Sequence, residues 1–436
     1  MNLNVIRNKN FILVFLGKVV SEFGTYLQSF ALSLYVLDKT GSAALFSTVI
    51  VVSMIPRIIL MPFAGVLSDR FSRKKMIVNM DILSGLFVLT MSGIFLINND
   101  LSLAMIYIIV IVLNTINVFF SPSMNSIMPD IVEKDKLADA NSFMEMGGAI
   151  IALTAPIVAG VLFSSFGILP IMIVNSISFL LSAASESFIK IKKESIVSKE
   201  DHEGFMESFK AGLSYLKSMP EFIILIAVTV IANFALGPIF SVALPIVVLK
   251  DFGLSEATYG LIASLMTIGM FIGPLFASGI IKRFHYSKLV SSILSIGGII
   301  CLLIALSCVK GIFPNIRYNT IIMVVLINIL MITVIWVNLS ITTARQKIVP
   351  GHLQGRVVSV VGMFAMIAMP LGQLLMGFLL DNGKSYIIIG LFAIVVFVSG
   401  LFAKIGFSKL ARSGKMDITL GVEKAINEEA AEIETI

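Results

Sequence analysis

Twelve long apolar stretches dominate this chain, and each is long enough to cross the hydrocarbon core of a membrane as a helix. Such a crossing needs roughly 20 mostly apolar residues, because a helix rises about 1.5 Å per residue and the core is about 30 Å thick. The stretches occupy residues 11–37, 43–68, 76–97, 102–121, 138–163, 168–190, 221–249, 257–281, 289–309, 319–344, 356–380 and 385–407. None shows the alternating pattern of an outer-membrane barrel. The sequence therefore predicts an all-α polytopic membrane protein with 12 transmembrane helices.

The overall composition also indicates lipid as the solvent. Of the 436 residues, 57% are hydrophobic and only 13% are charged, whereas an average soluble domain has roughly 25% charged residues. No water-soluble fold could hide so much apolar surface. The two cysteines, Cys301 and Cys308, lie seven residues apart in one apolar stretch, and we expect them to be packing residues rather than ligands.

The distribution of lysine and arginine predicts how the chain is oriented, because cytoplasmic loops carry an excess of these residues. With the N-terminus in the cytoplasm, 25 of the 32 basic residues fall on the cytoplasmic side. The predicted external ones are Lys39, Lys250, Lys310, Arg317 and Lys384, and Lys18 and Arg57 remain within spans. We therefore expect a multi-pass protein of the cell membrane with both termini in the cytoplasm, and we expect no nucleic-acid partner despite the net charge of +6.

A single long polar segment in the interior divides the spans into six and six. The predicted parts are an N-terminal six-helix bundle (1–190), a cytoplasmic linker (191–220), a C-terminal six-helix bundle (221–407) and a disordered cytoplasmic tail (408–436). Within the linker, Phe205, Phe209 and Leu213 recur every fourth residue. That spacing predicts an amphipathic helix lying along the membrane interface.

A weak internal repeat supports the division into two halves. Ala64 and the pair Arg70-Phe71 recur as Ala277 and Arg283-Phe284 at a constant offset of 213 residues. Two related half-length bundles are the arrangement of twelve-span transporters that rock around a site at the middle of the membrane.

A short hinge between the second and third stretches combines a glycine, an acid and a dense group of bases. Its members are Gly65, Asp69, Arg70, Arg73 and Lys74. The glycine allows two helices to approach closely, and the acid and the bases can pair across the hinge. A charged hinge between two membrane spans indicates a protein whose spans move against each other.

These residues resemble the loop signature of the major facilitator superfamily, with Ser72 in place of the usual second glycine. Other segments are similar to its macrolide-efflux and siderophore-exporter branch. They are Thr40-Gly41-Ser42, Pro122 with Pro129-Asp130-Ile131-Val132, Leu137 with Ala140-Asn141-Ser142, Gly355-Arg356-Val357, and Pro370-Leu371-Gly372 with Gly377. The resemblance covers residues 10 to 407. It places the first proline segment after span 4 and Gly355 at the opening of span 11.

The resemblance implies two bundles that alternate access to the two sides, driven by an ion gradient and usually by protons. It also implies contacts that hold a cytoplasmic gate. By this likeness Asp69 would contact the start of span 11 near Arg356, and Arg73 would contact an acid such as Asp130.

Charged residues within the spans are candidates for transport chemistry, because each costs about 2.5–3.5 kcal/mol at the centre of a bilayer. Counting along the helices places Glu22 and Arg57 at nearly the same depth, with Lys18 one turn below Glu22. One interpretation makes Glu22 a proton carrier or the counter-charge for a cationic substrate. The other makes Glu22 and Arg57 a fixed ion pair. The excess cation would equally attract an anionic substrate, so the sign of the substrate stays open.

Three further acids lie in the cytoplasmic halves of spans 3, 5 and 6. Asp81 follows Lys74 closely, which favours a role in stabilising the gate over a role in transport. Glu145 is a candidate for the cavity or for a structural pair, and Glu186 is expected at the interface.

Polar and aromatic residues inside spans are candidates for contacting substrate, although amides also join helices to each other. The candidates are Tyr26, Asn114, Asn117, Glu145, Asn233, Phe234, Trp336, Asn338 and Gln373.

Enzyme motifs do not compete with this interpretation. The segment from Gly377 to Ser385 has one residue too many for a phosphate loop, and the three histidines lack zinc spacing. We therefore expect no metal, no cofactor and no enzyme activity. The sequence predicts a proton-coupled exporter of amphipathic small molecules in a lipid environment. The alternatives are an importer or lipid mover of the same fold and, from another class, a membrane enzyme or sensor.

Overall fold

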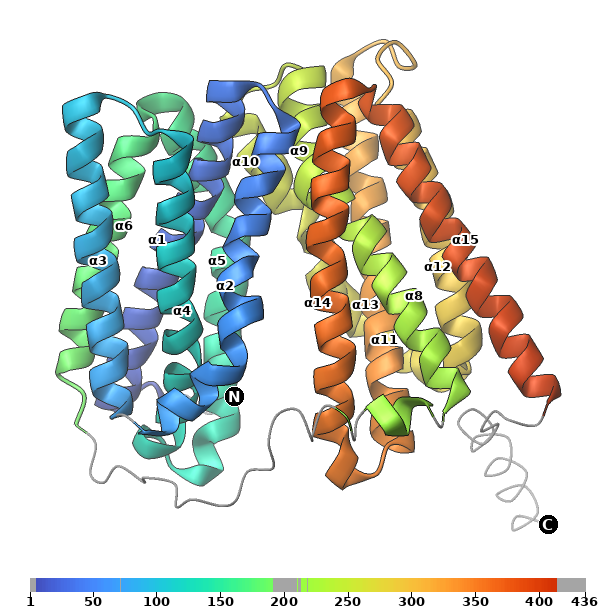
Figure 1. Cartoon of the computed structure of the whole chain (residues 1–436), viewed down its shortest axis with the longest axis horizontal. Coiled ribbons are helices and arrows are strands. Elements are labelled where there is room, and N and C mark those ends of the chain that lie inside the picture. The colour runs from blue at the N-terminus through green and yellow to red at the C-terminus, as the bar shows by residue number, and fades with distance from the viewer. Residues whose placement is uncertain (1–4, 71, 191–209, 211–212, 218, 414–436) are drawn as a thin grey trace. The chain divides into compact units, whose positions relative to one another are not determined.

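Twelve helices long and apolar enough to cross a membrane are present, one for each predicted stretch. The structure, a computed structural model, describes residues 5–70, 72–190, 210, 213–217 and 219–413, and the side chains of 62–70 and 352 are not described. In the first half the helices are α1 (Lys9–Thr40), α2 (Ala43–Arg70), α3 (Arg73–Asn98), α4 (Leu103–Ile131), α5 (Leu137–Phe166) and α6 (Ile168–Ser187), with a short turn η2 (Lys134–Lys136) before α5 (Figure 1). Most of the predicted linker and the tail beyond 413 lie outside the described residues.

The second half has the same number of crossings, two of them interrupted. The seventh is α8 (Pro220–Pro238), η3 (Ile239–Ala243), α9 (Leu244–Ile246) and η4 (Val247–Asp251), and the eighth is α10 (Glu256–Met266) and α11 (Ile268–Arg283). Four continuous helices follow, α12 (Tyr286–Ser307), α13 (Ile316–Ile348), α14 (Gly351–Asn382) and α15 (Ser385–Arg412). Helices α2 and α11 end at Arg70 and Arg283, the two arginines that the internal repeat pairs.

The chain divides into two compact units. One comprises Met1–His202 with Gly253–Leu265, and the other comprises Glu203–Phe252 with Met266–Ile436. Almost all of α10 thus groups with the first unit, where the Tyr259 ring stacks on Phe30 of α1 at a centroid distance of 5.2 Å.

Helix α4 differs from its predicted extent. It continues to Ile131 and contains both Pro122 and Pro129, whereas the sequence placed these prolines after the span. Proline removes one backbone donor, but membrane helices tolerate it where neighbouring groups satisfy the freed backbone. The Arg73 guanidinium adds a contact to the last turns, where it donates to the Ser126 carbonyl at 3.0 Å.

Helices α1 and α6 pack through small and polar residues. A Cβ placed on Gly24 would lie 2.5 Å from the Asn175 Oδ1 atom, so only glycine allows this approach. The Asn175 amide donates to Gln28 Oε1 at 2.6 Å, and both side chains are buried. Close approach of small residues and hydrogen bonds between helices are the main attractions between helices in lipid.

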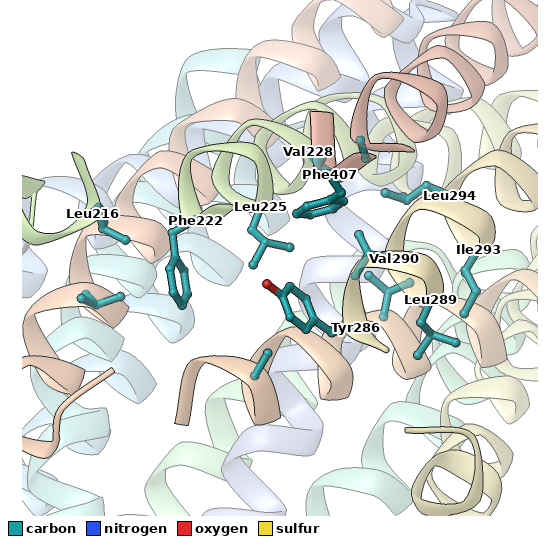
Figure 2. Close-up of a cluster of buried hydrophobic side chains, with 14 of the residues drawn as sticks. Leu216, Phe222, Leu225, Val228, Tyr286, Leu289, Val290, Ile293, Leu294 and Phe407 are labelled. Atoms are coloured by element: carbon teal, nitrogen blue, oxygen red, sulfur yellow. The ribbon is translucent and has the colours of Figure 1, made fainter. Parts of the chain in front are cut away.

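The second unit has a hydrophobic cluster that includes the last residues of the linker. Leu216 is buried against Phe222, Tyr286 and Phe407 (Figure 2). The Tyr286 hydroxyl donates to Glu221 Oε2 at 2.6 Å, which satisfies an acid that is 3% exposed. The described end of the linker therefore packs onto protein, whereas the sequence predicted a helix on the membrane interface. Phe205 and Phe209 lie outside the described residues.

Side chains of α13 stabilise the interrupted eighth span. Asn328 Oδ1 accepts a hydrogen bond from the Gly269 N–H at 2.6 Å, and the Trp336 indole N–H donates to the Gly273 carbonyl at 2.9 Å. The break between α10 and α11 leaves backbone groups without helical partners, which hydrocarbon cannot satisfy. Both side chains therefore have a structural role here.

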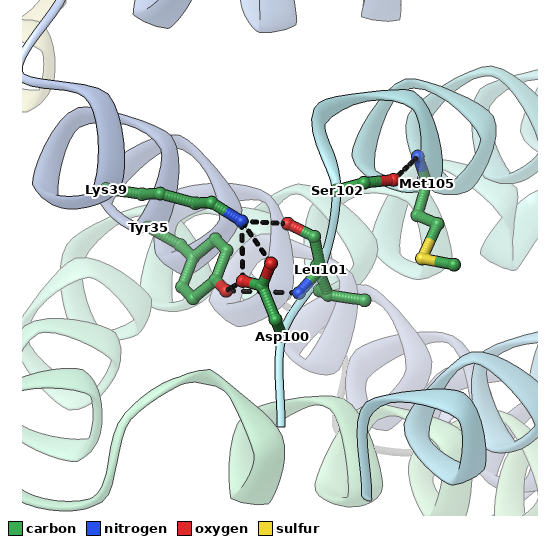
Figure 3. A network of polar contacts seen from close by, with 6 residues as sticks. All are labelled: Tyr35, Lys39, Asp100, Leu101, Ser102 and Met105. Carbon is green, nitrogen blue, oxygen red and sulfur yellow. Dashed lines mark hydrogen bonds and ion pairs between the residues drawn. The ribbon is translucent and has the colours of Figure 1, made fainter. Parts of the chain in front are cut away.

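A polar network ties the end of α1 to the start of α4 (Figure 3). Lys39 Nζ contacts Asp100 Oδ2 at 2.6 Å and the Leu101 carbonyl at 2.7 Å, and the Tyr35 hydroxyl donates to Asp100 at 2.7 Å. Helix α1 ends at Thr40, the residue after Lys39. The residue that caps it, Gly41, lies in the left-handed region at φ 63°. Glycine is favoured there because it has no Cβ, which explains the Thr40-Gly41-Ser42 segment.

Gly372→Ala is expected to destabilise the second unit by about 1–3 kcal/mol, the usual cost of overpacking. A Cβ at Gly372 on α14 would collide with the Phe234 carbonyl oxygen and Pro238 of α8. Gly362→Ala on the same helix is the matched control, because nothing lies within 4 Å of its Cβ position. Thermal unfolding in detergent measures both variants, and equal midpoints would contradict the close contact.

Asp100→Asn is expected to lower stability at neutral pH and to have a smaller effect in acid. The hydrogen bond from Lys39, and then that from Tyr35, lowers the pKa of Asp100 from its ordinary value of 3.8. A lowered pKa in the folded state gives stability that is present above the ordinary value and is lost as the pH falls through the lowered one. Thermal unfolding of both proteins at pH 7 and at about pH 3 measures this. A difference between the two proteins that is as large in acid as at pH 7 would contradict the assignment.

Candidate functional site

A cavity of about 520 Å³ in the first unit is built by five helices. Helix α1 supplies most of its polar lining, α4 supplies a row of amides, and α2, α3 and α6 close the remaining walls. This volume lies within the 300–1,000 Å³ that is usual for small-molecule sites.

The polar lining of α1 forms one continuous stripe. Its members are Lys18, Ser21, Glu22, Thr25, Tyr26, Gln28, Ser29 and Ser33, which follow each other at spacings close to three and four residues and so share a face. The hydroxyls satisfy themselves within the helix, since Thr25 donates to the Ser21 carbonyl at 2.8 Å and Ser33 to that of Ser29 at 3.0 Å. The charged side chains of the stripe are therefore the groups that can interact with another molecule.

The three charged residues singled out in the sequence all line this cavity. Lys18 Nζ lies 3.9 Å from Glu22 Oε2, one helical turn apart, with side chains 27% and 33% exposed. Arg57 of α2 is exposed and makes no ion pair or hydrogen bond with the described residues. The fixed pair between Glu22 and Arg57 is therefore not formed there, and a cation is left over in the cavity.

Helix α4 adds a second polar row to the wall. It consists of Asn114, Asn117, Ser121 and Asn125, again three or four residues apart. Asn114 donates to the Val110 carbonyl at 2.8 Å. Tyr26 is 48% exposed and lies opposite these amides in the lining. Three of the predicted substrate contacts, Tyr26, Asn114 and Asn117, thus share one cavity.

The other predicted contacts do not line this cavity. In the second unit, the Gln373 amide donates to Ser241 Oγ at 2.9 Å, and Asn233 donates to the Thr229 carbonyl of its own helix at 2.9 Å. Phe234 stacks on Phe392 at 5.9 Å, and Trp336 has the structural role described above. Glu145 of the first unit and Asn338 of the second are exposed. Hydrogen bonding within the protein therefore accounts for Asn233 and Trp336 without a substrate, and for the amide nitrogen of Gln373 but not for its carbonyl oxygen.

The gate signature is described only in part. Arg73 Nη1 contacts Asp130 Oδ2 at 2.7 Å, with side chains 13% and 6% exposed, which is the contact implied by the resemblance. Lys74 is half-buried and Arg356 lies in the first turns of α14. The side chains of Gly65, Asp69 and Arg70 lie outside the described residues, so the expected contact of Asp69 stays a prediction.

Two acids occupy places that the sequence did not indicate. Asp81 lines the cavity and is 3% exposed, and its predicted role in stabilising the gate stays a prediction. Glu186, expected at the interface, lies in the last turn of α6 and is fully buried within the protein. Sequence depth alone does not indicate this burial, because it does not say which way a side chain points around its helix. For the missed residues Ser21, Thr25 and Ser29, the signal was present as their spacing along α1.

In the described part of the chain, twelve helices apolar enough to cross a membrane, together with a polar cavity inside the first unit, indicate a multi-pass membrane transporter. The family model described as transmembrane secretion effector, of the major facilitator superfamily, matches residues 2–417. The chain belongs to this family, and the predicted family and fold class are both confirmed.

Similar proteins of known sequence include exporters. Macrolide efflux protein A of Streptococcus pyogenes is 24% identical over 376 residues, which cover 85% of this chain and 89% of that protein. The putative bacilysin exporter BacE of Bacillus subtilis (strain 168) is 32% identical over 173 residues, 39% of this chain and 42% of that protein.

Among solved structures, a bacterial homologue of the iron transporter ferroportin in its inward-facing state has a TM-score of 0.68 and 16% identity. The match covers 93% of this chain and 98% of that one. At this identity the likeness concerns the fold.

Arg73→Ala is expected to lower the free energy of unfolding by about 3 kcal/mol, because it leaves the Asp130 carboxylate buried without its cation. Lys136→Ala is the matched control. Its pair with Glu133 lies at the surface, where Glu133 is 71% exposed, and such pairs contribute about 0–1 kcal/mol. Chemical unfolding in detergent measures both variants. Similar losses from the two variants would show that the Arg73 pair is not a buried one.

Proposed function

We propose that this protein is a secondary active exporter of amphipathic small molecules that works by alternating access and is driven by the re-entry of protons. The observation that supports it most directly is the cavity of about 520 Å³ in the first unit, with its polar stripe and charged residues. The names of two relatives, a macrolide efflux protein and a putative bacilysin exporter, support export of small organic molecules.

The lining of the cavity suits a cargo that is part apolar and part polar. Leu32, Ile50, Leu113 and Phe120 offer apolar contacts beside the serines and amides. Glu22 is one-third exposed, and its 3.9 Å approach to Lys18 is too long for a hydrogen bond. Its carboxylate is therefore accessible to a donor or a cation on the cargo. We assign Glu22 and the amides Asn114 and Asn117 to substrate binding.

The orientation and the energy source complete the proposal. The excess of basic residues in the predicted cytoplasmic loops favours cytoplasmic termini in the cell membrane. One proton that moves inward through 100 mV in exchange for an uncharged substrate supplies about 2.3 kcal/mol, which sustains roughly a fifty-fold gradient of that substrate. This is sufficient for an exporter without a nucleotide-binding motif.

Inside-out vesicles test the proposal. Acidifying their interior should cause the wild-type protein to accumulate a macrolide or a cationic dye. Glu22→Gln is expected to raise the KM about tenfold, equivalent to about 1.4 kcal/mol of binding. Glu133→Gln, which neutralises an acid at the surface, is the control and should transport like the wild type.

Two outcomes would contradict the proposal. Absence of accumulation by the wild type across a panel of macrolides and dyes would argue against export. Uptake of the same compounds by intact cells expressing the protein would indicate an importer. An unchanged KM in Glu22→Gln would remove this carboxylate from the binding site but leave export intact.

A further inference from the structure

Two acids in the first unit are buried beside each other in the membrane-spanning region. Asp81 belongs to α3 and is 3% exposed, and Glu186 belongs to α6 and has no exposed surface. The two carboxyl groups are close enough to interact electrostatically. Ser182, one turn before Glu186 on α6 and 1% exposed, lies next to both. We call these three residues the carboxyl pair with its serine.

Ser182 is the hydroxyl that lies next to the two acids. Its Oγ, Asp81 Oδ2 and both carboxyl oxygens of Glu186 nevertheless make no well-formed hydrogen bond within the described part of the chain. Glu221 of the second unit is a useful contrast, because it is equally buried and accepts a hydrogen bond from Tyr286 at 2.6 Å. A native protein pairs nearly all its buried polar groups. One hydroxyl can donate to only one of the two acids at a time, so the pair has capacity left for a proton.

No neighbouring cation neutralises the two acids within the described residues. On α1, which packs against α6, Lys18 and Glu22 lie near each other at 3.9 Å. On α2 Arg57 is exposed to the cavity, on α5 Glu145 is exposed, and α4 lines the same cavity with uncharged amides. Two buried carboxylates without a cation would both repel each other and lack solvation. At least one of them must therefore hold a proton.

Space and access favour a small ligand. A Cβ on Gly17 of α1 would lie 3.0 Å from Ser182 Oγ and 3.4 Å from Glu186 Oε1, so little room remains around the pair. Asp81 meanwhile forms part of the wall of the cavity, whereas Glu186 does not line it. One carboxyl group is thus in contact with the transport cavity and the other is shielded from it.

We propose that Asp81 and Glu186 form the proton-binding site that drives transport, separate from Glu22, which engages the cargo; this rests on the proposed function. Asp81 receives a proton through the cavity when the cavity is open to the outside. The proton is then shared with Glu186, so that the pair carries one negative charge in place of two. It leaves through Asp81 when the cavity opens to the cytoplasm, and one proton enters per cycle.

Separate sites for proton and cargo explain the arrangement of charges on α1. Glu22 is one-third exposed and has Lys18 beside it, which suits contact with cargo. The buried pair has neither an exposed surface of more than 3% nor a cation beside it within the described residues, which suits a proton.

The test distinguishes the coupling of transport to protons from the movement of the substrate itself. In inside-out vesicles with an acidic interior, the wild type should concentrate cargo up to about fifty-fold. In Glu186→Gln and Asp81→Asn, the ratio of internal to external cargo should fall toward one. Both variants should keep counterflow, the exchange of labelled for unlabelled cargo with no proton gradient. Glu221→Gln is the matched control, because it neutralises a buried acid that already has a partner, and it should retain both activities.

Three results would overturn the inference. One is proton-driven accumulation in Glu186→Gln and Asp81→Asn at the wild-type level. Another is accumulation that follows a sodium gradient and not a proton gradient in the wild type. The third is loss of counterflow together with accumulation in variants that elute as folded protein on size exclusion, which would assign the pair to cargo binding or structure. If the wild type itself moves no cargo, the proposed function fails instead.

Discussion

Hydrocarbon offers no hydrogen-bond partner, and this constraint determines where almost every polar side chain of the chain lies. The Gly269 N–H, freed by the break at Thr267, donates to Asn328, and the buried Glu221 accepts from Tyr286. In the first unit, the Asn175 amide donates to Gln28 between α1 and α6. Around the cavity, the charged residues and the amides of α4 lie where another molecule can contact them.

The same constraint distinguishes polar residues with a structural role from polar residues that can bind a ligand. An asparagine in a span is structural where its hydrogen bonds end on a neighbouring helix, as at Asn328. It is a candidate for binding where it lines a cavity, as at Asn117. Composition cannot distinguish the two cases, because both follow from the high cost of an unsatisfied polar group in lipid.

The predicted fold followed from hydropathy alone, because crossing lipid requires long apolar helices whatever the tertiary packing. The end of α4 was wrong, since Pro122 and Pro129 were taken to stop a helix that Arg73 and neighbouring helices support. For the candidate site, Lys18, Glu22 and Arg57 were found because charge in a span is rare. The burial of Asp81 and Glu186 was not predicted, because their depth was judged from the chain while their burial depends on which neighbours α3 and α6 face.

Helix α1 joins the two groups of charges that the proposed transport cycle uses. Gly17 packs against Ser182 and Glu186, and the next residue, Lys18, lies beside Glu22 in the cavity. A change in the charge of the buried pair therefore acts one residue away from the cation that faces the cargo. In the proposed cycle, loss of the proton adds a negative charge to the pair and so makes the electrostatic potential along α1 more negative. Proton release would then change the electrostatic field in the cavity without any ligand contact between the two sites, which is the link that an exchange of proton for cargo requires.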